Sequence, residues 1–126
     1  YTPSWVFDGV PQNRIWHNYL TILRLRNVDP MIVGEYLQDH KTEVLSYFFV
    51  DWDQLFYGTG EEYTQEKIKA LTVAYQDFAR KDFREELRKY RIDYILFVGE
   101  IKPAMKRQLP DIKLLYNSGE YFLYQF

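Results

Sequence analysis

A short apolar run, Tyr-Ile-Leu-Phe-Val over Tyr94–Val98, constrains the fold more than any other stretch of this sequence. Asp93 precedes the run and Gly99-Glu100 follows it, so it is too short for a buried helix and fits a β-strand. Because apolar and polar residues do not alternate within it, the run is typical of a strand that is covered on both faces. Such a strand needs helices on both sides of its sheet, which predicts an α/β domain of three layers.

Amphipathic segments on either side of this strand provide the outer layers. Apolar residues recur every three or four positions in the longer segments, as they do along the buried side of a helix. Asp82 and Glu85 stand at the spacing of a capping box, which places the start of one helix at Asp82. We therefore predict helices over residues 12–26, 30–40, 64–78, 82–90 and 103–109.

A second core strand is predicted over residues 44–50, which are rich in β-branched and aromatic side chains. Two strands joined by helices form a crossover unit, in which the strands run parallel. Near the end of the chain, Asn117-Ser-Gly119 separates two strand-like runs and predicts a hairpin. We therefore expect a Rossmann-like α/β domain of three layers, with a small, mainly parallel sheet and a C-terminal β-hairpin.

Length and composition favour a single domain over residues 1–126, with residues 1–11 as an irregular lead-in. The net charge of -2 offers no basic field for phosphates, so nucleic acid is not an expected partner. The chain has no cysteine, which excludes disulfides and thiolate metal sites. No window approaches the ~20 apolar residues that span a bilayer, so this stretch is expected to be soluble by itself. It begins at Tyr1, as a mature product or a piece of a longer protein would.

Polar and small residues follow both predicted strands, and we interpret them as the ligand-facing edge of the sheet. Parallel strands end at one edge, where open α/β folds bind their ligands. Carboxylates beside an aromatic ring suit a sugar, since the acids accept hydrogen bonds while the ring covers an apolar sugar face. The other interpretation is a solvated rim with Trp52 packed into the core. The candidate residues are Asp51, Trp52, Asp53, Gly58, Thr59, Gly60, Glu100 and Lys102.

Two catalytic or cofactor interpretations compete with the sugar site. Glu100-x-Lys102, with Asp51 or Asp53, resembles the acidic half-site of metal-dependent nucleases, although the acidic chain is poorly suited to nucleic acid. Gly58-Thr-Gly60 has two glycines of a phosphate loop, but it lacks the third glycine and the lysine, and two glutamates follow it. We predict no cofactor and assign no metal ligand, and the nuclease-like domain remains the alternative function.

The C-terminal part resembles the tail of polytopic bacterial membrane proteins of the GT-C glycosyltransferase type. Two segments carry the resemblance: Phe83-Arg-Glu-Glu-Leu-Arg-Lys-Tyr-Arg-Ile-Asp-Tyr-Ile-Leu-Phe-Val98 and Leu114-Leu-Tyr-Asn-Ser-Gly-Glu-Tyr-Phe-Leu-Tyr-Gln-Phe126. In such tails a helix closes with leucine, lysine and tyrosine, a strand of the Asp-Tyr-Ile type follows, and a hairpin ends the chain. Phe56-Tyr-Gly-Thr-Gly60 is similar to the preceding segment, so the resemblance covers roughly residues 43–126.

This resemblance implies a function outside the membrane. The chain would be a non-catalytic, extracytoplasmic accessory or binding domain of a membrane-embedded glycosyltransferase-like protein, whose membrane part carries the catalytic acid. The implied partners are the membrane-embedded part of the same polypeptide and a carbohydrate or lipid-linked sugar. The sequence departs from the tails at Gly99-Glu-Ile-Lys102, where a small or proline-containing loop is more usual. This departure keeps the nuclease alternative open.

Overall fold

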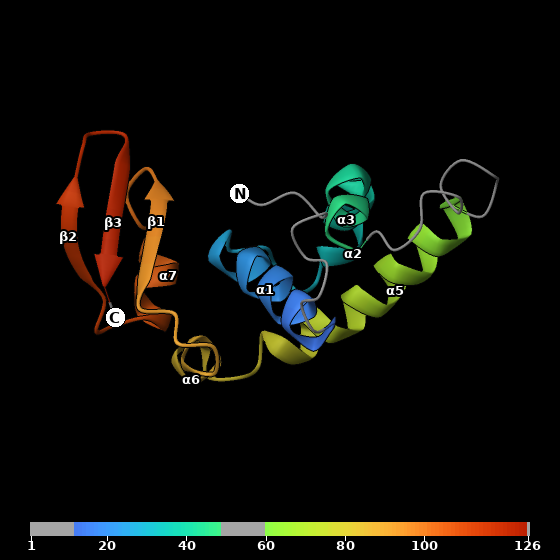
Figure 1. Cartoon of the computed structure of the whole chain (residues 1–126), viewed down its shortest axis with the longest axis horizontal. Coiled ribbons are helices and arrows are strands. Elements are labelled where there is room, and N and C mark those ends of the chain that lie inside the picture. Colours follow the sequence, from blue (N-terminus) through green and yellow to red (C-terminus); the bar gives the residue numbers. More distant parts are fainter. Residues whose placement is uncertain (1–11, 49–59, 126) are drawn as a thin grey trace. The chain divides into compact units, whose positions relative to one another are not determined.

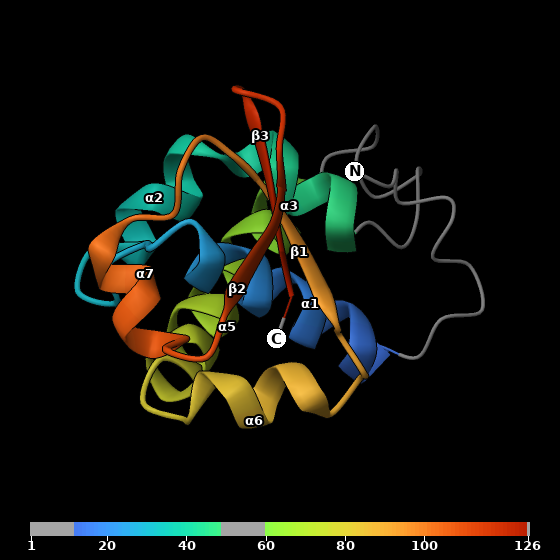
Figure 2. The ribbon, with the colours of Figure 1, turned by 90° about the vertical axis from the view of Figure 1, so that its left-hand side faces the viewer.

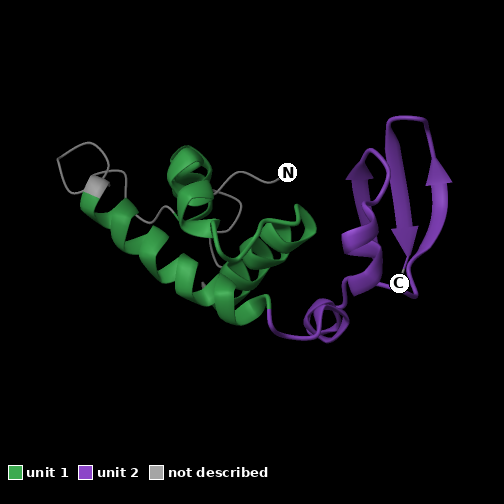
Figure 3. Cartoon of the chain, turned by 180° about the vertical axis from the view of Figure 1, so that it is seen from behind, with its two compact units in different colours: residues 1–79 green, residues 80–126 purple. Residues whose placement is uncertain are grey.

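The computed structural model describes residues 12–48 and 60–125, and the chain divides into two compact units. Unit 1 comprises Tyr1–Ala79 and unit 2 comprises Arg80–Phe126 (Figure 3). This division does not test whether residues 1–126 fold as one domain, which stays a prediction.

The described residues of unit 1 form helices joined by turns (Figure 1), and buried apolar side chains of these helices make up its core. Helix α5 packs against α1, α2 and α3. Tyr19, Leu23, Val33, Leu37 and Leu71 are completely buried in this core. The helices are α1 (Gln12–Leu25), α2 (Val33–Asp39), α3 (Lys41–Phe48) and α5 (Gly60–Phe78).

Helix α1 follows the sequence prediction closely. Ile15, Tyr19 and Leu23 are buried at four-residue spacing, as an amphipathic helix requires. Asn27, with a φ of 57°, lies in the left-handed region just past the helix, where asparagine is tolerated, and its N–H donates to the Arg24 carbonyl. The buried Arg24 donates in turn to the carbonyl of Phe78 at 2.9 Å. This bond fastens the end of α1 to the last turn of α5.

The predicted strand over residues 44–50 is wrong, because residues 41–48 form α3. Val44, Tyr47 and Phe48 are buried, at the three- and four-residue spacing of a helix. The ring centroids of Tyr47 and Phe48 lie 4.8 and 5.3 Å from that of Tyr19. These contacts with α1 stabilise the helical conformation of residues 41–48. A short apolar run fits either period, and here contacts with the other helices outweigh strand propensity. Phe49 and Val50 lie outside the described residues.

Unit 2 is a small sheet with two short helices. Figure 1 shows β3 between the other strands, with its arrow opposed to both, so the sheet has the order β1-β3-β2 and is antiparallel throughout. In Figure 2 the turn that joins β2 to β3 is at the top of the view. The elements are α6 (Phe83–Arg88), β1 (Tyr94–Val98), α7 (Pro103–Gln108), β2 (Lys113–Asn117) and β3 (Tyr121–Gln125).

The strand at Tyr94–Val98, the helices at α6 and α7 and the terminal hairpin are confirmed, whereas the mainly parallel, Rossmann-like sheet is wrong. Without a strand at 44–50, β1 has no parallel partner in the described chain. It pairs with the second strand of the hairpin instead, and Leu96 lies opposite Leu123. The crossover argument assumed two strands, and the structure contains only one of them.

The inner face of this sheet belongs to the core of unit 2. Ile95 and Tyr124 are paired across β1 and β3, and both are buried. The Tyr124 ring meets Phe97 edge-on at 5.7 Å, and its hydroxyl accepts the N–H of Ile101 at 3.2 Å. Leu87 of α6 and Leu109, the residue after α7, are also buried and line one cavity within unit 2.

The stability of the protein at high pH should depend on Tyr75, a buried tyrosine in α5. Its hydroxyl donates to the carbonyl of Val28 at 2.7 Å, and burial raises its pKa to about 12. An unfolded tyrosine loses its proton near pH 10, so between about pH 10 and 12 the unfolded chain binds fewer protons than the folded one. We therefore expect the free energy of unfolding to fall as pH rises through this window.

Urea denaturation at pH 8 to 11.5 checks this expectation by comparing the wild type with Tyr75→Phe. At pH 8 the variant should lose about 1 kcal/mol with its hydrogen bond. Its further loss toward pH 11.5 should be smaller than that of the wild type, because no hydroxyl remains to ionise at this position. Parallel pH profiles for the two proteins would contradict the assignment.

Candidate functional site

The predicted ligand-facing residues are only partly within the described chain. Asp51, Trp52, Asp53, Gly58 and Thr59 lie outside the described residues. Gly60 is the first residue of α5, in unit 1. Glu100 and Lys102 belong to unit 2, where Glu100 is exposed after β1 and Lys102 is the exposed residue immediately before α7. The structure therefore brings together Glu100 and Lys102 alone, within one loop.

The predicted edge at which two parallel strands end together does not exist in the part of the chain that the structure describes. Residues 44–48 are helical, so there is no second parallel strand whose end could meet that of β1. What lies beside the end of β1 is the start of β3: the N–H of Gly99 donates to the carbonyl of Glu120 at 2.8 Å. Gly99 has a φ of 87°, a conformation suited to glycine, and it turns the chain away from the sheet. Glu100 and Glu120 therefore stand at the same end of an antiparallel sheet.

The opposite side of the sheet from the core presents large apolar residues to solvent. Tyr94, Leu96 and Val98 alternate with the inward-facing residues of β1 and are 56%, 61% and 75% exposed. Cross-strand partners share a face, and Leu123 lies opposite both Leu96 and Tyr116, so the apolar surface crosses all three strands. We call this surface the outer sheet face; it comprises Tyr94, Leu96, Val98, Tyr116, Tyr121 and Leu123.

The size of the outer sheet face distinguishes it from ordinary exposed leucines. Its side chains expose on the order of 600 Å², the upper end for the largest apolar patch on a typical monomer. Fully burying a side chain such as Leu96 contributes about 1.5–3 kcal/mol, so covering this face is strongly favourable. A register shift between Leu114 and Tyr116 places Leu115, also half-exposed, beside it. This face is the main candidate for a functional surface.

No protein-family model, curated protein or solved structure matches this chain. The outer sheet face was also missed by the sequence prediction, because the unbroken run in β1 indicates burial on both faces. The strand β3 (Tyr121–Gln125) is likewise apolar at four successive positions, so its sequence does not reveal which face is covered either.

Unit 2 also contains a small cavity of about 40 Å³ between α6 and the segment before β2. Leu87, Ile92, Leu109 and Ile112 give it apolar walls, and two arginines and Asp111 line its polar side. A cavity of this size holds a few water molecules at most. It therefore offers no room for a substrate within the described residues that line it.

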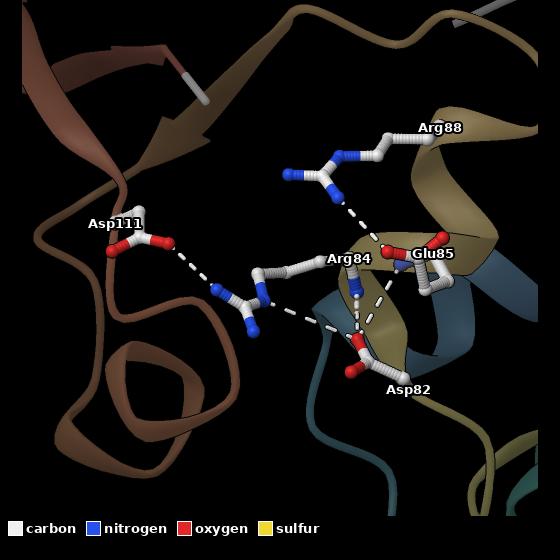
Figure 4. Close-up of polar contacts among 5 residues, drawn as sticks. All are labelled: Asp82, Arg84, Glu85, Arg88 and Asp111. Carbon is white, nitrogen blue, oxygen red and sulfur yellow. Dashed lines mark hydrogen bonds and ion pairs between the residues drawn. The ribbon is translucent and has the colours of Figure 1, made fainter.

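Two arginines on the polar side of this cavity form ion pairs (Figure 4). Arg84 reaches from α6 to Asp111, with 2.6 Å between Nη1 and Oδ2, and Arg88 pairs with Glu85 at 2.9 Å. Asp82 accepts the N–H groups of Arg84 and Glu85, which confirms the predicted helix start. Exposed pairs of this kind are worth about 0–1 kcal/mol each. Of these, the Arg84–Asp111 pair joins α6 to the residues before β2, whereas the Arg88–Glu85 pair lies within α6.

In unit 1, Lys67 lies in a cage of aromatic rings. Its Nζ is 5.2, 5.5 and 5.3 Å from the ring centroids of Trp16, Phe48 and Tyr63. Burial lowers the pKa of Lys67, while the negative faces of three rings stabilise the ammonium and act in the opposite direction. Tyr63 also donates to the carbonyl of Phe48. The cage is filled by the chain's own cation and ties α5 to α1 and α3.

Unit 1 also has a shallow groove between α2 and α5. Gly34 and Ile68 contribute to its floor, and Gln38 and Gln65 exchange hydrogen bonds of 2.6 and 3.1 Å across it. Over residues 12–48 and 60–125, no group of three or more histidine, aspartate or glutamate side chains is arranged to hold a metal ion. None of the helices in those ranges is both long enough and apolar enough to cross a membrane.

Proposed function

We propose that this chain is a binding and assembly domain, with the outer sheet face as its docking surface. The observation that carries the proposal is the continuous apolar surface over all three strands of unit 2, with Leu96 and Val98 more than half exposed. A patch at the upper end of what a typical monomer exposes is often functional, because burying it in a partner releases the free energy of hydrophobic burial.

The resemblance to GT-C type tails supplies the setting of this proposal. The order of α6, β1 and the β2–β3 hairpin agrees with the helix, strand and hairpin on which that resemblance rests, and this agreement supports it. In this setting the chain is an extracytoplasmic domain of a membrane-embedded glycosyltransferase-like protein. Its partners are the membrane-embedded part of the same polypeptide and a carbohydrate or lipid-linked sugar.

Hydroxyl-radical footprinting tests whether the outer sheet face is used for assembly. The isolated chain, at low micromolar concentration, is compared with the whole membrane protein that carries this sequence. We expect labelling of Tyr94, Tyr116 and Tyr121 to fall several-fold in the whole protein, since docking removes these rings from water. Met31, which is 86% exposed on unit 1, serves as the internal reference and should be labelled equally in both. Equal labelling of the three tyrosines in both samples would rule out docking through this face.

A further inference from the structure

We infer that the outer sheet face binds the same face of a second copy of this chain, so that the domain forms a homodimer of packed sheets. This inference rests on the proposed docking function and names the partner. It requires that the face be large enough, that its shape complement itself, and that its charges permit a two-fold arrangement. Each requirement is met by features of unit 2.

The exposed area matches what a stable dimer needs. The residues of the face expose on the order of 600 Å² in each copy, so complete pairing buries at most roughly 1,200 Å², at the lower bound of standard protein interfaces. The centre of the face is aliphatic, with Leu96 opposite Leu123, and tyrosines lie around it. Interfaces commonly combine an apolar centre with tyrosines, because a tyrosine buries its ring while its hydroxyl reaches water.

The shape of the face suits pairing with itself. Two sheets pack with their strands nearly aligned, about 10 Å apart, and side chains from the two inner faces interdigitate. A two-fold dimer uses one patch twice, so the patch must fit its own copy. Leu96 and Val98 project from alternate positions of β1 and leave spaces between them, which the matching side chains of the partner fill.

Charges at the two ends of the sheet select the direction of the two-fold axis. The end at Tyr94 carries Arg91, Asp93 and Lys113, besides Asp111, whose charge is balanced by its ion pair with Arg84. The end at Val98 carries Glu100, Lys102 and Glu120. One end thus has an excess of one positive charge and the other an excess of one negative charge. An axis that crosses the strands places unlike ends together, whereas an axis along the strands places like ends together. We assign the first arrangement, in which Lys113 of one copy approaches Glu120 of the other.

The charges at the ends of the outer sheet face and its aliphatic centre suit an anionic lipid surface or a sugar less well than a second copy of the chain. Two acids at one end of the face disfavour an anionic lipid surface, which attracts lysine and arginine. At the centre of the face, Leu96 and Leu123 offer a sugar no hydrogen-bonding group, and the tyrosine hydroxyls lie around this centre. A second copy presents the matching apolar centre and the opposite charge at each end.

Sedimentation velocity over 1–500 µM chain at physiological salt tests the dimer. We expect the wild type to pass from monomer to dimer across this range. Leu96→Glu should weaken the dimer by at least about 100-fold, because it buries an unpaired carboxylate at the centre of the interface. Val73→Glu is the matched control: Val73 is 66% exposed on α5 in unit 1, so this variant should dimerise like the wild type.

Two further variants keep the test decisive. Val98→Glu should repeat the effect of Leu96→Glu, and far-UV circular dichroism should show that both variants stay folded, since both side chains are exposed. Lys113→Glu and Glu120→Lys should each weaken the dimer several-fold, and the double variant should regain most of the affinity. Recovery in the double variant is specific to the axis that crosses the strands.

The possible outcomes separate this inference from the function on which it rests. A wild type that stays monomeric up to 500 µM overturns the homodimer, while footprinting of the membrane protein still decides whether the face docks elsewhere. A dimer that survives Leu96→Glu and Val98→Glu shows that another surface associates, which also overturns the inference. Loss of the dimer in Val73→Glu to the same extent has the same consequence.

Discussion

Replacing Ile95 with alanine should destabilise unit 2 by about 2–5 kcal/mol, whereas the same change at Leu96 should cost less than about 1 kcal/mol. The two residues are neighbours in β1, but Ile95 is 7% exposed and Leu96 is 61% exposed. Truncating Ile95 removes buried contacts and leaves a cavity beside Tyr124, with which it is paired. Leu96 points away from the core, so its truncation leaves the interior unchanged.

Hydrogen exchange of the β3 amides in a urea series measures this difference. The exchange readout is needed because the two units need not unfold together, so a global signal would mix them. The comparison is made at low micromolar concentration, where self-association does not stabilise either protein. Equal losses for the two variants would mean that β1 is covered on both faces, as its uninterrupted apolar run first indicated.

In unit 1, the largest effect is expected at Tyr19. Tyr19→Ala should cost about 3–5 kcal/mol, because it deletes a completely buried ring that contacts the rings of Tyr47 and Phe48 at 4.8 and 5.3 Å. These contacts join α1 to α3, so the loss should be accompanied by reduced helicity over Lys41–Phe48.

Tyr19→Phe is the matched control, since it keeps the ring and removes only the hydroxyl. That hydroxyl donates to Glu43 over a long 3.5 Å, so we expect a cost of less than about 1 kcal/mol. Burial, with a smaller contribution from Glu43, raises the pKa of Tyr19 well above its usual value, so the hydroxyl is neutral at the pH of the measurement. Thermal and urea denaturation followed by tryptophan fluorescence give both values for unit 1, because all three tryptophans of the chain lie within residues 1–79. A loss in Tyr19→Phe as large as that in Tyr19→Ala would assign the stabilisation to the hydroxyl.

Elements with a local chemical signal were predictable from the sequence. Asp82 caps α6 as its spacing with Glu85 indicates. The hairpin turn is also encoded locally, because the side chain of Asn117 accepts the N–H of Gly119 at 2.7 Å and Gly119 adopts a φ of 90°. These interactions lie within three or four residues of each other, so the sequence alone contains both partners.

The predictions that were wrong concern features that depend on contacts between residues far apart in the sequence. Residues 44–48 satisfy both a strand and a helix pattern, and the decision is made by contacts with Tyr19, more than twenty residues away. The run in β1 carries apolar residues on both faces, so nothing in it shows which face the core covers. The location of Glu100 and Lys102 after β1 was predicted correctly, but their proposed partners at a shared parallel edge were not, because that edge depended on the missing strand.

The order of the sheet has a consequence for how this chain behaves when it is concentrated or heated. Because β1 is an outer strand, one row of its backbone N–H and C=O groups has no strand partner among the described residues. The strand contains neither proline nor a charged residue, a composition typical of segments that form cross-β fibrils. The nearest charged residues in the sequence, which would oppose such pairing, are Asp93 before it and Glu100 after it. Burying the outer sheet face leaves this edge open, so association through the faces and growth through the edges are separate processes. Tyr94–Val98 therefore both contributes three side chains to the proposed docking surface and is the segment at which irreversible aggregation would begin.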